Sequence, residues 1–202
     1  MRFKSVLFLS LLTFTFGCKE RKPLPILGEK MMLNGKEVNH QIPDFSFINQ
    51  DSVAVTQKDF EGKIYVADFF FTSCPTICPV MKTQMLRIYE RFKTNSDVKL
   101  LSHSIDPTHD TPANLRTYVT RLGVNTPQWQ FVTGDRKKLF EIGEKAYMVT
   151  TKADSTVEGG LLHSGAFLLV DKKRQIRGQY DGTKAAEVDQ LMEDMALLLE
   201  EK

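Results

Sequence analysis

The sequence is poor in cysteine, with three in 202 residues, and has no apolar run of the length that crosses a membrane. Three cysteines are too few for the disulfide framework that stabilises many small exported domains. A spanning helix needs about 20 apolar residues, whereas the apolar stretch from Val6 to Phe16 is shorter. A chain of this length is long enough for one domain with its own hydrophobic core.

Net charge is also absent once the first residues are set aside. Of the 27 basic residues, Arg2 and Lys4 lie in an N-terminal segment without acids, which leaves 25 basic against 25 acidic side chains. A formally neutral chain has no general positive field, so we expect no nucleic-acid partner. The short basic runs at 136–138 and 172–174 are interpreted as solvated turns.

The N-terminus is organised like a bacterial export signal. Arg2 and Lys4 precede the apolar stretch, and Gly17 and Cys18 follow it. A small residue before a cysteine at this point is typical of lipoprotein cleavage, after which the cysteine carries the lipid. Thr15 departs from that pattern, which usually has an aliphatic residue there. The competing interpretation is an ordinary secretory signal with an incidental cysteine.

We favour lipidation at Cys18, because it ends the apolar stretch and a polar, proline-containing segment follows. We therefore expect a signal peptide of lipoprotein type at 1–17, a lipidated N-terminus and tether at 18–41, and a domain at 42–202. This organisation predicts a lipid-anchored protein of the bacterial cell envelope, with the domain outside the cytoplasm and facing the periplasm.

Strand and helix patterns alternate through the domain. We expect strands at 45–48, 53–56, 64–71, 98–105, 128–133, 166–170 and 175–180, and helices at 81–92, 112–122, 137–145 and 185–200. The run IYVADFFF at 64–71 is a continuous apolar run of strand length, as in a buried central strand. This order predicts an α/β domain with a mixed central sheet flanked by helices, the thioredoxin-like arrangement.

The most informative segment is FFFTSCPTICPVM, which places Cys74 and Cys78 four residues apart just after the predicted central strand. We expect both cysteines on an exposed loop at or near a helix N-terminus, where N–H groups and the helix dipole favour thiolate. Thiolate is needed for metal ligation and for disulfide exchange alike. A structural disulfide or two inert thiols are the plainer interpretations of the same pair.

A single histidine, His163, lies 85 residues after Cys78 and just before the predicted strand AFLLV. In a thioredoxin-like sheet the loop before that strand faces the cysteine loop. Two thiolates and an imidazole suit Cu(I), or Cu(II) with an added ligand. Zinc stays open, although a closed zinc site needs a fourth ligand. His40, His103 and His109 are interpreted as solvated or packing residues.

Three segments together, FTSCPTICPVM, HSIDPTHDTP and HSGAFLLVD, resemble the Sco (SenC-type) family of copper-binding assembly factors for cytochrome c oxidase. The resemblance covers nearly the whole domain. It implies copper ligation by Cys74, Cys78 and His163. It also places Asp106 near the site, with an outer-shell or proton-handling role, although Asp106 and Asp110 also suit turn or cap positions.

The same resemblance implies two roles at the CuA centre of oxidase subunit II, namely copper delivery and reduction of that subunit's cysteine pair. A copper donor and a thiol reductant are then further partners. Cys74 and Cys78 form the redox-active pair in either role, and a disulfide between them excludes copper. The protein is thus predicted to be a metallochaperone, with enzymatic activity left open.

The alternative is a thiol–disulfide oxidoreductase of the cell envelope without copper delivery, which needs only the cysteines. Reductases of the thioredoxin type have a C-x-x-C spacing and a proline opposite it, and this chain departs from both features. A peroxidase of the peroxiredoxin type is set aside, because no proline stands five to eight residues before Cys74.

Overall fold

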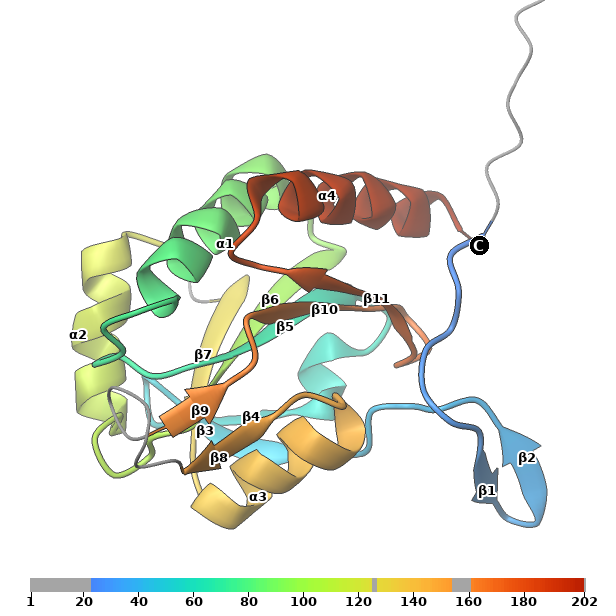
Figure 1. Cartoon of the computed structure of the whole chain (residues 1–202), viewed down its shortest axis with the longest axis horizontal. Helices are drawn as coiled ribbons and strands as arrows, with labels where there is room; N and C mark the ends of the chain where they lie inside the picture. Colours follow the sequence, from blue (N-terminus) through green and yellow to red (C-terminus); the bar gives the residue numbers. More distant parts are fainter. Residues whose placement is uncertain (1–22, 125–126, 154–160, 202) are drawn as a thin grey trace, which may run out of the picture.

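The structure, a computed structural model that describes residues 23–124, 127–153 and 161–201, is built around a mixed sheet of seven strands (Figure 1). The strand order is β11-β10-β5-β6-β7-β3-β4. The bounds are β3 (Ser46–Asn49), β4 (Ala54–Thr56), β5 (Ile64–Phe70), β6 (Val98–Ser104), β7 (Trp129–Thr133), β10 (Ala166–Val170) and β11 (Ile176–Asp181). β5, β6 and β7 are parallel, whereas β10 and β3 join them antiparallel, so the predicted mixed sheet is confirmed.

The four predicted helices are also present: α1 (Cys78–Phe92), α2 (Pro112–Leu122), α3 (Arg136–Glu141) and α4 (Ala185–Glu200). A 3-10 turn, η1 (Gln57–Phe60), precedes β5, and a π-helical turn, η2 (Ile142–Ala146), continues α3. Figure 1 shows α1 and α4 together on one side of the sheet and α3 on the other. Within the described ranges, no helix combines the length and apolar content that a membrane crossing requires.

Strand β5 lies inside the sheet, between β10 and β6, and all seven of its residues are buried. Phe70 pairs with Ser104 of the parallel strand β6, and Ala67 pairs with Leu168 of the antiparallel strand β10. The carboxyl ends of β5 and β6 and the start of β10 therefore lie at the same end of the strands. This register brings the cysteine loop, the loop after β6 and residues 163–165 to the same end of the domain.

Part of the predicted tether is ordered against the domain. Two short strands, β1 (Met31–Leu33) and β2 (Lys36–Val38), form an antiparallel hairpin. Before the hairpin, the Leu27 N–H donates to the Ile176 carbonyl at 2.8 Å, and Arg177 Nη2 donates to the Leu24 carbonyl at 2.8 Å. These bonds attach the arm at the end of β11 that lies opposite the cysteine loop.

His40 was predicted to be a solvated residue of the tether, but it is half-buried against η2. Its Nε2 lies 2.6 Å from the Ala146 carbonyl oxygen, and a Cβ on Gly28 would lie 2.7 Å from the His40 side chain. The sequence of the arm does not indicate this contact, because only the tertiary packing of the domain brings His40 and Ala146 together.

A second hairpin was also not predicted. Strands β8 (Thr151–Ala153) and β9 (Leu161–His163) pair antiparallel, with Thr151 opposite His163, and the Ser164 N–H donates to the Thr150 carbonyl at 3.0 Å. Strands of three residues are too short to show a period of two. The hairpin holds the backbone of His163 directly before β10.

Candidate functional site

The cysteine loop, residues 71–78, connects the end of β5 to the start of α1. The Cys74 N–H donates to the Phe71 carbonyl at 3.2 Å, which closes a tight turn directly after the strand. Cys78 is the first residue of α1, and Pro79 occupies the first turn, where its missing N–H costs no helix bond. The predicted position at a helix N-terminus is therefore confirmed for Cys78.

The two cysteines are reduced and buried, with Cys74 9% and Cys78 7% exposed, so the expectation of an exposed pair was wrong. Cys78 borders a small cavity between the sheet and helices α1 and α2. Its lining includes Asp68, Met81, Ser102 and Tyr118. Burial follows because the helix begins at Cys78 itself and turns this side chain toward the sheet.

The two sulfurs are in hydrogen-bond contact, and their environments differ. Burial raises the pKa of Cys74, but hydrogen bonds from the Cys78 thiol and from the backbone of Thr76 and Cys78 outweigh it, so the pKa is lowered overall. Burial and the hydrogen bond that it donates to Cys74 raise the pKa of Cys78 well above its ordinary value. Cys74 is therefore the thiol that ionises first, and Cys78 holds its proton.

Asp68 is a buried carboxyl on β5 close to Cys78, and the sequence patterns did not single it out. It is 5% exposed, and its Oδ1 has no hydrogen-bond partner within the described residues. Burial raises its pKa to about 7, against a smaller lowering by the Ser102 hydroxyl, and its charge in turn raises the pKa of Cys78. An acid within an apolar run is the sequence signal that points to this residue.

Replacing Asp68 with asparagine is expected to stabilise the protein in a pH-dependent way. Because burial raises the folded-state pKa from 3.8 to about 7, the folded state is penalised progressively as pH rises through that interval. The gain in unfolding free energy over wild type should be small at pH 4 and reach about 2 to 4 kcal/mol at pH 8. Urea unfolding at both pH values measures it. A difference independent of pH would contradict the raised pKa.

Of the two aspartates in the loop between β6 and α2, Asp110 does not have the role expected of it. Asp110 was interpreted as a turn or cap residue, but the N-cap of α2 is Thr111, and Asp110 is fully buried. Its Oδ2 accepts the Thr72 N–H at 3.1 Å and the Ser104 hydroxyl at 2.6 Å, and its Oδ1 accepts the Thr72 hydroxyl. Asp110 thus contacts the cysteine loop directly.

Asp106 faces another neighbour. Its carboxylate lies 3.4 Å from Arg136 Nη2, and its N–H donates to Ser104 Oγ at 3.1 Å. The outer-shell role of Asp106 stays a prediction.

His163 ends β9, but its side chain lies outside the described part of the structure, as does the whole of Cys18. The backbone brings the segment that follows His163 to the cysteine loop. Gly165, two residues on, would carry a Cβ 3.8 Å from Ile77 Cδ1, and Ile77 directly precedes Cys78. The predicted approach of the pre-β10 loop to the cysteine loop is therefore confirmed for the backbone. Among the described side chains no cluster of three His, Cys, Asp or Glu could hold a metal.

The donor set fits a soft, thiophilic metal better than a hard one. Two sulfurs in mutual contact can bind one ion, and an ion there displaces the remaining thiol protons. Thiolates with an imidazole select copper or zinc over magnesium or calcium, which take oxygen ligands.

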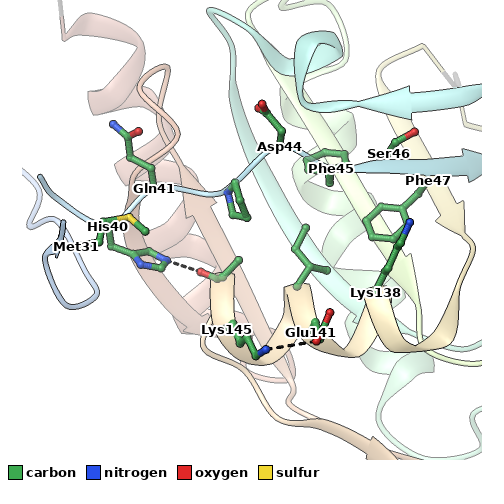
Figure 2. Close-up of a pocket in the computed structure, with 13 residues that line it drawn as sticks. Met31, His40, Gln41, Asp44, Phe45, Ser46, Phe47, Lys138, Glu141 and Lys145 are labelled. Carbon is green, nitrogen blue, oxygen red and sulfur yellow. Dashed lines mark hydrogen bonds and ion pairs between the residues drawn. The ribbon is translucent and has the colours of Figure 1, made fainter. Parts of the chain in front are cut away.

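Two hollows on the surface differ in their relation to this site. One, of about 750 Å³, is lined by Ile77, by residues 164–166 and by the start of α4, so it opens beside the cysteine loop. The other, of about 660 Å³, lies between the N-terminal arm and the α3–η2 segment (Figure 2). His40, Phe45, Phe47 and Lys138 line this second hollow, and no cysteine does. No cysteine lines the first hollow either, but Ile77, the residue before Cys78, does.

The SCO1/SenC family model matches residues 34–200 of the chain. The SCO1 protein homolog of Bacillus subtilis (strain 168) is 29% identical over 160 residues, which span 78% of this chain and 82% of that protein. The name of this relative gives its family only.

Solved structures give the same picture. A SCO1/SenC family lipoprotein from Bacillus anthracis has a TM-score of 0.73 at 29% identity, covering 80% of this chain and 96% of that one. BsSco, a member of the Sco family of cytochrome c oxidase assembly proteins with a disulfide switch, has a TM-score of 0.71 at 28% identity, covering 82% and 96%. Arabidopsis thaliana ScoI, solved with copper bound, shares the fold at 24% identity, with a TM-score of 0.63 and coverage of 77% and 98%. The predicted thioredoxin-like fold is confirmed.

Proposed function

The chain belongs to the SCO1/SenC family, and from this membership and the paired thiols we propose that it binds copper and assists assembly of the CuA centre of cytochrome c oxidase. The observation that carries the proposal is the contact between Cys74 and Cys78, in which one thiol ionises readily and the other donates a hydrogen bond to it. Copper is cargo in this scheme, held by both sulfurs and by His163. The oxidase assembly role of BsSco supports the choice of target.

The chemistry follows from the pair. Thiolate sulfur suits Cu(I), and loading the site releases the proton that Cys78 holds. Oxidation to a Cys74–Cys78 disulfide removes both thiolates, so the redox state of the pair controls copper binding. The disulfide switch described for BsSco is consistent with this coupling.

Delivery can be tested with the soluble copper domain of oxidase subunit II. We expect copper-loaded protein to transfer its metal to the reduced target domain, so that copper appears in the target while this chain returns to the metal-free dithiol. Transfer no faster than from a copper–glutathione solution would contradict delivery. The two proteins are separated before metal analysis, which gives the copper content of each one.

A second candidate is reduction of the target's own cysteine pair, and the unequal pKa values of the two thiols favour it. The Cys74 thiolate would attack one sulfur of the target disulfide and release the other as a thiol. Cys78 would then displace the target from the mixed disulfide, leaving two target thiols and one Cys74–Cys78 disulfide. Such a role without copper delivery is the oxidoreductase alternative, and a thiol reductant would have to restore the dithiol.

We also propose lipidation at Cys18 and attachment to the bacterial envelope. The leader pattern supports it, as does the B. anthracis relative described as a lipoprotein. Cys18→Ala is expected to move the protein from the membrane fraction to the soluble envelope fraction, since no lipid can then be added. Metabolic labelling with a fatty acid should fail in the variant. Equal membrane retention and labelling would contradict lipidation at this residue.

A further inference from the structure

The cysteine loop is tied to strand β6 through the buried carboxylate of Asp110. Asp110 has no exposed surface, so hydrogen bonds from Thr72 and Ser104 stand in for its hydration. Thr72 donates twice, through its N–H and its hydroxyl, and Ser104 donates once at 2.6 Å. Charge-assisted bonds of this kind are among the strongest that a neutral donor makes.

These bonds hold a point in the loop that decides where Cys74 lies. Thr72 is the second residue of the turn closed by the Cys74 N–H and the Phe71 carbonyl at 3.2 Å. Ser104 is the last residue of β6, a strand whose hydrogen bonds to β5 and β7 fix it in the sheet. Asp110 therefore links the turn that contains Cys74 to the rigid strand β6. Helix α1 fixes the position of Cys78.

We propose that Asp110 is a positioning residue, whose carboxylate holds the turn at Thr72 against β6 so that the sulfurs of Cys74 and Cys78 face each other. The inference rests on the proposed use of these cysteines as a dithiol. Closure of a disulfide within a chain depends on the effective concentration of one thiol at the other, which fixed geometry raises. A loosened turn lowers that concentration without touching either sulfur.

The test is the equilibrium with glutathione, in which protein dithiol and oxidised glutathione give protein disulfide and two reduced glutathione. Asp110→Asn should lower this equilibrium constant about tenfold, because the amide places an NH₂ against groups that are themselves donors. Thr72→Val removes one donor and no charge, so it should lower the constant in the same direction by a smaller factor. The double variant should be no worse than Asp110→Asn, since both changes break one linkage.

The matched control is Asp171→Asn at the opposite end of the sheet. Asp171 is also buried, 7% exposed, and it accepts backbone N–H groups of a turn, those of Lys173 and Gln175, although it also pairs with Arg177 at 3.1 Å. The Asp171→Asn variant loses a buried carboxylate that holds a turn far from the thiols. Its glutathione equilibrium should match that of the wild type. A similar shift in this control would mean that the Asp110 effect is general destabilisation, and it would overturn the proposal.

Two further results would overturn the proposal. One is an unchanged constant in Thr72→Val, which also decides the question if Asp110→Asn does not fold. The other is strict additivity in the double variant, which would mean that the two side chains act independently and not through one linkage. No copper enters this equilibrium, so a failure of copper binding leaves the test intact and is distinguishable from it.

Discussion

Replacing Cys74 or Cys78 with serine is expected to abolish both copper binding and disulfide formation. A hydroxyl does not ionise near neutral pH and is a poor ligand for a soft ion, so a single thiolate and an imidazole are left. We expect copper affinity to fall at least about 100-fold, given that even the loss of a partner outside the first ligand shell costs 10- to 100-fold. Titration against a chromophoric Cu(I) chelator measures the affinity, and thiol counting after oxidation measures the disulfide.

Ser73→Ala is the matched control for these variants, because Ser73 is exposed in the same turn and directly precedes Cys74. It should bind copper and form the disulfide as wild type does. Full copper affinity in either serine variant would contradict a site built on both sulfurs. Circular dichroism before each titration separates a lost ligand from a lost fold.

Replacing His163 with alanine is expected to separate the two chemistries of the pair. The variant loses the proposed imidazole ligand, so copper affinity should fall about 100-fold or more. The Cys74–Cys78 disulfide needs only the sulfurs and should form with an unchanged glutathione equilibrium. The same chelator titration and the same thiol counting read the two outcomes.

His109→Ala is the control histidine, exposed in the loop between β6 and α2. Wild-type copper affinity is expected for it. If His163→Ala also kept wild-type affinity, the three-ligand site would be wrong, and the dithiol reductase would become the better account. If His163→Ala lost the disulfide as well, the residue would be acting on the loop rather than as a ligand.

The parts of the fold that could be predicted are those with long, unambiguous patterns. The apolar run that becomes β5 has the length typical of a buried strand, and so does the run at Ala166–Val170. Pro112 and Gly123 bound α2 for reasons that lie in the chain itself, a preset φ and a left-handed cap at φ 66°. These elements were enough to predict that the cysteine loop and the loop after His163 lie close together.

The choice between Asp106 and Asp110 could not be made from the sequence. The two stand four residues apart in one polar loop, and each precedes or neighbours a turn signal. Asp110 is the buried one because the register of β5 with β6 brings Thr72 and Ser104 to the same point. A pairing between strands sets that register, and no local pattern encodes it.

The burial of the thiols and the attachment of the arm were missed for a related reason. Prolines beside Cys74 and Cys78 indicated a loop, yet helix α1 starts at Cys78 and turns it inward. The arm is polar in composition, but its backbone is held by Ile176 and Arg177 at a distant strand. Contacts made by backbone groups leave no trace in the side chains of the arm.

The most direct test of the central claim, that the redox state of the Cys74–Cys78 pair controls copper binding, is the copper content of the leaderless protein prepared as the dithiol and as the disulfide. Each form is exposed to copper under nitrogen, passed over a desalting column and analysed for metal, with thiols counted on the same sample. The account predicts about one copper per chain in the dithiol form and none in the disulfide form. Equal copper in the two forms, or none in the dithiol, would contradict it.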